Sequence, residues 1–409
     1  MKQLAIIGKV FPEPQSTAAG KRMLQLINLF QAQDYQITFL SSAAASENSF
    51  DLSQKNIQVQ NILLNDASFD EVIQKINPEI VIFDRFTTEE QFGWRVSEQV
   101  PNAIKILDTE DLHFLRSARE NAFKQKRIVE NSDLNNDVFK REIASILRCD
   151  LSLIISDFEM DLLANHFKID KTILHYLPLF ADKKSNKVAF SDRKNFVSIG
   201  NFLHEPNWQT VLQLKKLWPP IKKQLPEAQM HIYGAYASEK VYQLHNEKEG
   251  FLIKGRAEKV ETVFNEAKVL LAPIPFGAGI KGKLLESMEL GLPNVTSSIG
   301  AEAMHGNLLW NGFIADNESE FIEKAVLLYQ DENLWKQAQE NGYRIAEEKF
   351  RKELFETDFW ERILNISKNL EEHRNANFLG QILQHHTLQS TRYLSKWIEE
   401  KNKKANPEL

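Results

Sequence analysis

A glycine-rich loop that leads into an amphipathic helix, residues 275–293 with the sequence PFGAGIKGKLLESMELGLP, carries the side chains best suited to chemistry. It follows a short apolar run, residues 269–274, that is typical of a strand buried in a parallel sheet. Gly277, Gly279 and Gly282 let the backbone turn tightly and approach a ligand, because glycine has no Cβ. The free N–H groups of the helix's first turn then face outward from the strand's carboxyl end, which suits an anionic phosphate.

Three charged side chains extend this pattern. Lys281 and Lys283 add cations that a buried structural loop would avoid. A helix dipole contributes only about 0.3 to 2 kcal/mol, so the backbone donors and the lysines must supply most of the phosphate affinity. Glu286 lies one turn later and could accept hydrogen bonds from a ribose diol, as acidic groups do in other nucleotide sites. The alternative is that the segment is simply a tight strand-to-helix connection of an α/β protein.

The segments that must position this loop alternate between strand and helix patterns. In the first half we expect helices at 21–32 and 69–76, and strands at 4–10, 36–41, 80–83, 103–107, 151–155 and 172–177. Strands separated by helices imply parallel βαβ units with right-handed crossovers. The alternation restarts at Phe196, after a polar segment at 183–195 that reads as a linker. We therefore expect domains at 1–185 and 186–350, followed by C-terminal helices at 351–409.

The stretch FGAGIKGKLLESMELGLPNVTSSIGAEAM resembles the donor-nucleotide motif of glycosyltransferase family 4, the glycosyl transferases group 1, in its FGAGIKGK subgroup. The resemblance extends back through FVSIGNFLHEPNW, AQMHIYGAY and FLIKGRAEKVETVFNEAKVLLAPI, in the family's order, and is looser in the N-terminal half. It implies an α/β chain with the GT-B fold, in which two Rossmann-like domains face each other across a cleft. The first domain would hold the acceptor and the second the nucleotide sugar. The first of the C-terminal helices would pack back on the N-terminal domain.

The resemblance also implies an activity, namely transfer of a sugar from a nucleotide-diphosphate sugar to a hydroxyl of a glycan, lipid or small molecule. Family members retain the anomeric configuration and need no metal or other cofactor. In the family, the second glutamate of a pair contacts the ribose, and its match is Glu286, whereas the position of the first glutamate holds Ala278.

The loop after Phe196's strand, residues 200–207, has neither the arginine nor the lysine with which many relatives neutralise the diphosphate. His204 and Asn207 could donate instead, with Lys281 or Arg256 supplying charge. The loop at 11–21 resembles one near the donor sugar, although a plain surface connection is equally possible. We thus expect donor contacts from Gly20, His204, Asn207, Arg256, Gly277, Gly279, Ile280, Lys281, Lys283 and Glu286.

Two further segments follow predicted strands, where open α/β sheets bind ligands. Asp84 and Arg85 come first, as acceptor-side candidates or as a solvated ion pair, and the aromatic FGWR beyond them reads as a loop that could stack on sugars. Asp108, Asp111 and His113 follow the next strand.

Asp111 and His113 are the best acceptor-side candidates, and with Lys281 they form the expected catalytic set. A helix N-cap by Asp108 or Asp111 is the structural alternative. One histidine and two aspartates are a weak metal-ligand set, so we expect no metal. A retaining reaction needs no protein nucleophile. An inverting reaction would need Asp108, Asp111 or His113 as a general base.

Composition narrows the class of protein. A net charge of -6 argues against a nucleic-acid partner. The single cysteine, Cys149, has apolar neighbours and reads as a packed thiol in a reducing compartment. No run reaches the roughly 18 apolar residues of a membrane span, and the first strand is too short for a signal peptide, so we expect a cytoplasmic protein. An amphipathic helix at 377–400 could pack on its own domain, pair with a second subunit or lie on a membrane.

Rival functions are a nucleotide-sugar epimerase, a phosphorylase, which would be much longer, and a degenerate transferase that only binds a nucleotide or a partner. Ala278 and the missing basic pair motivate the last of these.

Overall fold

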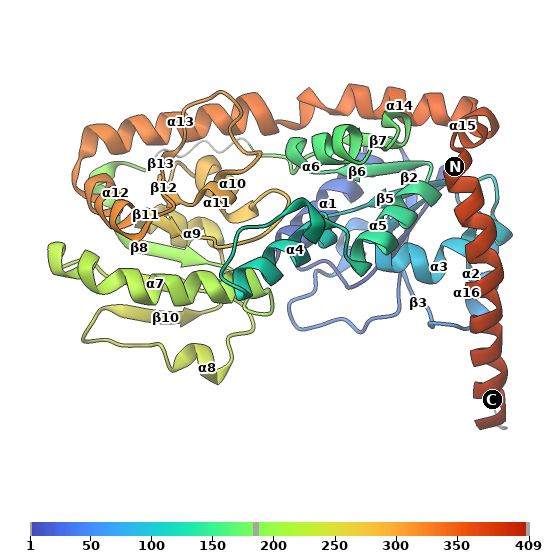
Figure 1. Ribbon diagram of the computed structural model, residues 1–409, viewed down its shortest axis with the longest axis horizontal. Coiled ribbons are helices and arrows are strands. Elements are labelled where there is room, and N and C mark those ends of the chain that lie inside the picture. Colours follow the sequence, from blue (N-terminus) through green and yellow to red (C-terminus); the bar gives the residue numbers. More distant parts are fainter. Residues whose placement is uncertain (1, 183–187, 406–409) are drawn as a thin grey trace.

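Two parallel sheets form the centre of the computed structural model, which describes residues 2–182 and 188–405 (Figure 1). The first has seven strands in the order β3-β2-β1-β4-β5-β6-β7, and the second has six in the order β10-β9-β8-β11-β12-β13. The first sheet is built from β1 (Lys2–Gly8), β2 (Tyr35–Ser41), β3 (Gln58–Asn61), β4 (Ile80–Asp84), β5 (Ile104–Asp108), β6 (Leu151–Ile154) and β7 (Leu174–Tyr176). The second is built from β8 (Lys194–Ile199), β9 (Met230–Tyr233), β10 (Phe251–Gly255), β11 (Ala267–Ala272), β12 (Asn294–Thr296) and β13 (Gly312–Ile314). Each sheet with its helices is called the first or the second domain below.

Helices cover both faces of each sheet. In the first domain they are α1 (Ala18–Gln31), α2 (Ser68–Ile76), α3 (Phe86–Gln99), α4 (His113–Lys124), α5 (Asp137–Arg148) and α6 (Asp157–Asp161). In the second they are α7 (Glu205–Gln224), α8 (Glu239–Tyr242), α9 (Val260–Glu266), α10 (Gly282–Glu289), α11 (Ser298–Ala301), α12 (Glu318–Gln330) and α13 (Glu332–Phe350). Each sheet therefore has a hydrophobic core on both faces, which is why the central strands β4 and β5 are buried at every position. The predicted α/β class with two parallel sheets is confirmed.

The order of each sheet reverses at its first strand. In the first sheet β1 lies between β2 and β4, and in the second β8 lies between β9 and β11. Ligands bind at such switch points, beyond the carboxyl ends of the strands. The fold therefore directs two loop-lined edges, one from each domain, toward a common space.

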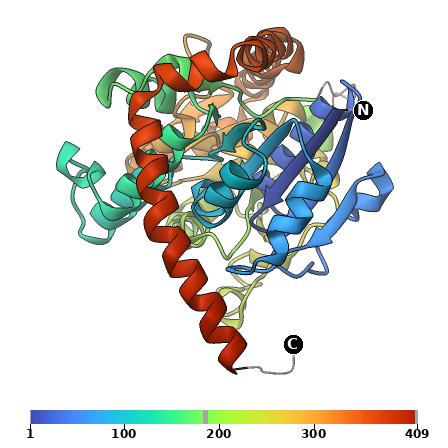
Figure 2. The ribbon, with the colours of Figure 1, turned by 90° about the vertical axis from the view of Figure 1, so that its right-hand side faces the viewer.

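The C-terminal helices connect the two domains again. After α13, α14 (Glu356–Lys368) buries Phe359, Ile363 and Ile366 in a core of the first sheet. The Phe359 ring meets Phe30 edge to face at 5.8 Å. α15 (Leu370–Ala376) follows, and α16 (Phe378–Ala405) runs across the first domain against α5 and α3 (Figure 2). Within the described residues no helix has both the length and the apolar composition that a membrane span requires.

Three sequence expectations need comment. The FGWR segment is not a loop that stacks on sugars, because it lies inside α3 and buries Phe92 and Trp94. The edge strand β3 was not predicted, since three of its four residues, QVQN, are polar and all four are exposed. The predicted domain boundary at 185–186, within the expected linker, lies outside the described residues.

Candidate active site

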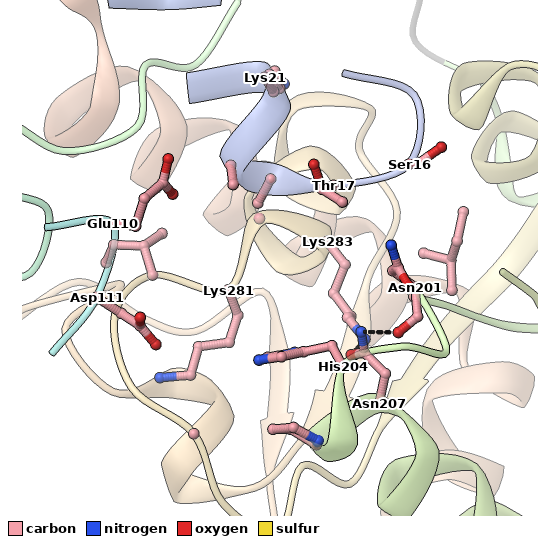
Figure 3. A pocket seen from close by; sticks show the side chains of 18 of the residues that line it. Ser16, Thr17, Lys21, Glu110, Asp111, Asn201, His204, Asn207, Lys281 and Lys283 are labelled. Atoms are coloured by element: carbon pink, nitrogen blue, oxygen red, sulfur yellow. Dashed lines mark hydrogen bonds between the residues drawn. The ribbon is translucent and has the colours of Figure 1, made fainter. Parts of the chain in front are cut away.

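A cavity of about 670 Å³ lies between the two domains, at the carboxyl ends of both sheets. Figure 3 shows Glu110 and Asp111 on one side of it, His204, Asn207 and Lys283 on the other, and Lys281 between them. Its charged and polar lining includes Lys9, Ser16, Thr17, Lys21, Arg85, Glu110, Asp111, His113 and Arg116 from the first domain, and Asn201, His204, Asn207, Arg256, Lys281, Lys283 and Glu286 from the second. Gly277 and Ile280 also line it.

The glycine loop between β11 and α10 is held against the first domain. Gly279 has a φ of 61°, and its N–H donates to Oε1 of Glu159 at 2.8 Å. A Cβ at this position would lie 2.8 Å from the Cβ of Asp111, so only glycine permits the approach. The Gly277 carbonyl accepts from Arg119 at 2.7 Å. Gly279 is therefore not among the lining residues, and its N–H, an expected phosphate donor, is already engaged by a carboxylate.

The first turn of α10 keeps its donors. The helix begins at Gly282 with Lys281 as an N-cap that makes no side-chain capping bond. Among the described residues, the N–H groups of Gly282 and Lys283 donate to no protein acceptor. These amides and the positive end of the helix dipole together favour an anion at this edge of the cavity.

Lys281 and Lys283 flank those amides, and the positive charge of each lysine is only partly offset by nearby carboxylates. The Lys283 ammonium donates to Oδ1 of Asn207 at 2.7 Å, and burial lowers its pKa to about 8 although Glu286 opposes the shift. The Lys281 ammonium donates to the carbonyl of Gly279 at 2.8 Å. Burial lowers the pKa of Lys281 to about 8 as well, with Glu302 opposing. Cations whose charged form is disfavoured in the free protein gain the most from an incoming anion.

Glu286 lies at the same mouth of the cavity, on the next turn of α10. Its carboxylate is 3.6 Å from the ammonium of Lys21 on α1, which also bonds Glu289 at 3.3 Å. Burial raises the pKa of Glu289 to about 7. Lys21 of the first domain therefore forms an ion pair with Glu286, the predicted ribose contact.

The loop after β8 supplies neutral groups. His204 precedes α7 at its N-cap, and burial, with Arg116 nearby, lowers its pKa to about 4, so the imidazole is uncharged at neutral pH. The Asn207 side chain donates to the carbonyl of Asn201 at 2.9 Å while accepting from Lys283. Arg256, after β10, completes this wall of the cavity. The structure brings all three expected residues to the cavity.

On the first-domain wall, His113 is oriented by two acceptors. Its Nδ1 lies 3.1 Å from the carbonyl of Asp111 and 3.3 Å from Oε1 of Glu142. Both partners only accept, so Nδ1 carries a proton and donates it, which fixes the orientation of the ring. The Asp111 carboxylate forms an ion pair with Arg116. Burial alone would raise the pKa of Asp111, but Arg116 and His113 more than offset it and hold the pKa well below its usual range.

Besides Gly279, three more of the expected ligand contacts do not line the cavity. Asp108 is fully buried and accepts twice from Nε of Arg22, at 2.8 and 3.1 Å. Asp84 is buried beneath the loop after β1 and accepts from the Lys9 N–H at 3.0 Å. Gly20 lies within α1, where a Cβ would come within 2.4 Å of the Glu13 backbone. Asp84 and Asp108 position their neighbours, because the ends of β4 and β5 that they occupy point into the packed loops.

The N-cap alternative for the aspartates is also wrong. α4 begins at His113 with Leu112 as its N-cap, and its first N–H groups, those of His113 and Phe114, donate to the Glu142 carboxylate instead of an aspartate.

Sequence reasoning missed the residues that join the domains at the site. Arg119 makes a bidentate pair with Glu302 at 2.7 Å for both bonds. Glu159, which is fully buried, bonds the N–H groups of Leu112 and Gly279 with a single oxygen. Burial, with Asp111 nearby, raises the pKa of Glu159 to about 8. Arg119 and Glu159 lie outside the quoted motifs, and only the fold brings them to Glu302 and Gly279, which lie within one. Lys9 was missed because the predicted first strand, 4–10, included it, whereas β1 ends at Gly8.

Comparison with known proteins agrees with this geometry. Residues 193–331 match the family described as glycosyl transferases group 1. No curated protein matches the chain. A structure of a TarM variant from S. aureus, in complex with fondaparinux, alpha-GlcNAc-glycerol and UDP, has a TM-score of 0.68 at 11% identity and covers 90% of this chain and 100% of its own. Sucrose-phosphate synthase from Thermosynechococcus elongatus has a TM-score of 0.66 at 12% identity, with 90% and 99% covered. Anabaena HepE in complex with UDP and glucose has a TM-score of 0.64 at 13% identity, with 89% and 99% covered.

These matches confirm the predicted GT-B fold and the resemblance to group 1 glycosyltransferases. The second domain carries the glycosyl transferases group 1 region, and the prediction that the chain is a glycosyltransferase is confirmed.

Proposed function

We propose that the chain transfers a sugar from a nucleotide-diphosphate sugar to an acceptor hydroxyl, with the donor's diphosphate bound by the first turn of α10. One observation carries the proposal: Lys281, which is buried, and Lys283, which is half-buried, lie beside two unengaged amides in a cavity that both domains line. Glu286 on the next turn is the proposed ribose contact. The TarM and HepE structures contain UDP, so UDP sugars are the first donors to test.

The arrangement suits the charge that develops during transfer. Breaking the anomeric bond builds negative charge on the leaving phosphate, and fixed donors there stabilise the transition state. Lys281, Lys283 and the amides at residues 282–283 supply such donors without a metal or another cofactor. Within the described residues no group of three or more histidine, cysteine, aspartate or glutamate side chains is arranged to hold a metal ion.

We propose a retaining reaction in which the departing phosphate takes the acceptor's proton. Asp111 supports this route because its ion pair with Arg116 and its low pKa make it a poor general base. His113 is then a positioning group, whose Nε2, when the ring is neutral, can accept a hydrogen bond from the acceptor hydroxyl. An inverting reaction would instead require His113 to remove that proton.

The decisive experiment measures nucleotide binding and donor turnover together. We expect the wild-type chain to bind UDP or GDP and to hydrolyse one of their sugars slowly without an acceptor. Lys283→Met should weaken nucleotide binding by about 10- to 100-fold, because it removes a charged hydrogen-bond donor. Lys216→Met is the matched control, since this lysine lies on α7 in the same domain, 64% exposed and paired with Glu318.

The other outcomes identify the rival functions. Binding without turnover of any sugar would indicate a non-catalytic nucleotide-binding protein. Interconversion of two nucleotide sugars would indicate an epimerase. If neither UDP nor GDP binds, the site assignment is wrong. A cytoplasmic location, and a membrane surface or a second subunit as the partner of the C-terminal helices, stay predictions from the sequence.

A further inference from the structure

Three cations of the first domain line the cavity, on other elements than the loop and helix that carry Lys281 and Lys283. Lys9 directly follows β1 and Arg85 directly follows β4, and these two strands are neighbours in the sheet. Arg116 lies one turn into α4, beyond β5, which is the next strand along. All three side chains line the cavity. The topology therefore adds positive charge to a cavity that Lys281 and Lys283 already line.

Arg85 is held in this place at a conformational cost. Its φ of 71° and ψ of 158° lie in a region that glycine almost alone adopts. Its guanidinium is 3.7 Å from the carboxylate of Asp84, which is too long for a hydrogen bond. In the described part of the chain no other ion pair or hydrogen bond reaches that guanidinium. A strained arginine with unused donors at a cavity wall is typical of a ligand contact.

Lys9 is similarly uncommitted. Its backbone N–H is bound to Oδ2 of Asp84, but its ammonium has no ion-pair partner within residues 2–182 and 188–405. Burial lowers the pKa of Lys9, and the neighbouring Arg85 lowers it further. The ammonium therefore faces other cations more than carboxylates.

The nearby acids attract this charge without taking up its donors. Asp111 is paired with Arg116, and Asp108 with Arg22. Burial alone would lower the pKa of Arg85, but Asp84, Glu110, Asp111 and Asp108 all raise it, which keeps the guanidinium charged. Among the described residues none of these carboxyl groups makes a hydrogen bond to that guanidinium, so its N–H groups are open to a ligand.

We infer that Lys9, Arg85 and Arg116 bind an oxyanionic group, a phosphate, sulfate or carboxylate, carried by the acceptor. The inference rests on the proposed function, because the donor's diphosphate is assigned to Lys281 and Lys283 and leaves the first-domain cations for a second anion. The acceptor is then an anionic sugar, polyol or lipid headgroup with a hydroxyl near its charge.

A binding experiment tests the subsite directly. Inorganic phosphate is titrated into the chain in the presence of saturating UDP, which fills the donor end of the cavity. We expect saturable binding in the wild type, weakened about 10- to 100-fold in Arg85→Gln and in Lys9→Gln, the range for losing a charged hydrogen-bond donor. Arg85→Lys should retain part of the binding. Lys140→Gln is the control, because this lysine is 66% exposed on α5 of the same domain.

A turnover experiment then compares acceptors in matched pairs, glucose with glucose 6-phosphate and glucuronate, and glycerol with glycerol 3-phosphate. We expect the anionic member to stimulate nucleotide release, and Arg85→Gln to raise its KM while leaving the KM of the donor unchanged. The phosphate and carboxylate members separate the two anion chemistries.

Either of two results would overturn the inference: phosphate binding that is equal in Arg85→Gln and Lys140→Gln, or neutral acceptors used as well as anionic ones. A larger effect of Arg85→Gln on donor KM than on acceptor KM would also do so, because the arginine would then serve the diphosphate. Failure of the proposed function is distinguishable, since it would appear as absent UDP binding in the wild type. Two separate variants keep the test valid if one of them unfolds.

Discussion

The lysines of the donor end predict that nucleotide affinity falls steeply as the pH rises through 8. Burial lowers the pKa of both Lys281 and Lys283 from 10.5 to about 8. This change corresponds to about 3 kcal/mol for each lysine, the cost of keeping it charged in the free protein despite its hydrogen bond to a neutral acceptor. A bound diphosphate stabilises the charged form, so binding restores the higher pKa and takes up protons.

The magnitude follows from the fraction of each lysine that is protonated. A group with a pKa near 8 is about 90% charged at about pH 7 and about 10% charged at about pH 9, so each lysine weakens binding about 10-fold over that interval. Both together weaken it about 100-fold. The direction of the pH dependence follows from this. Nucleotide affinity is constant at pH values below the pKa of the lysines in the free protein, and it falls at pH values above that pKa.

Isothermal titration calorimetry of UDP at several pH values, in buffers of different ionisation enthalpy, measures both affinity and proton uptake. Lys283→Arg isolates one contribution, because arginine stays charged throughout and should reduce the loss from about 100-fold to about 10-fold. Lys216→Arg, on the exposed face of α7, should leave the profile unchanged. An affinity that is constant from about pH 7 to about pH 9, without proton uptake, would refute the placement of the diphosphate.

Three further predictions concern the contacts that hold the site. Gly279→Ala should lower the free energy of unfolding by about 1 to 3 kcal/mol in urea titrations, because its φ of 61° is costly for alanine and the added Cβ would meet Asp111; an unchanged midpoint would contradict the packing. Arg119→Ala should raise the donor KM and lower stability by about 1 to 3 kcal/mol, since it removes the bonds to Glu302 and to the glycine loop; wild-type kinetics would show that the pair is dispensable. Cys149 should resist iodoacetamide until the chain unfolds, because burial raises the pKa of its thiol; rapid labelling of the native protein would contradict this.

Most of the fold could be predicted from local patterns. The apolar strands β1, β2, β4, β5 and β11 are buried on both faces and read as continuous hydrophobic runs, which single-sequence reasoning identifies well. β3 could not be found this way, because its four residues are exposed at the sheet edge. The start of α3 was obscured because the helix begins two residues after β4, without a capping side chain.

The candidate site was predictable on one wall and less so on the other. Lys281, Lys283 and Glu286 share a loop and the helix that follows it, so their sequence spacing predicted a common edge of the cavity. On the opposite wall, position after a strand was not enough to separate Arg85, which lines the cavity, from Asp84, which is buried behind it. Adjacent residues at a strand end point in different directions, and packing against α1 and β1 decides which one reaches the ligand.

The contacts between the domains explain why the donor loop could not be read from its own sequence. Glycines at 277 and 279 predicted a close approach to a ligand, and the structure instead shows a close approach to Asp111, Arg119 and Glu159 of the first domain. The Gly279 N–H consequently donates to the Glu159 carboxylate, whereas the N–H groups of Gly282 and Lys283, one turn later, donate to no acceptor among the described residues. This loop faces both the first domain and the cavity, so a change in how the domains meet must alter the donor end of the cavity. A ligand that attracts Lys281 also competes with the Gly279 carbonyl for the Lys281 ammonium. Donor binding and domain contact are thus coupled through three residues of the loop.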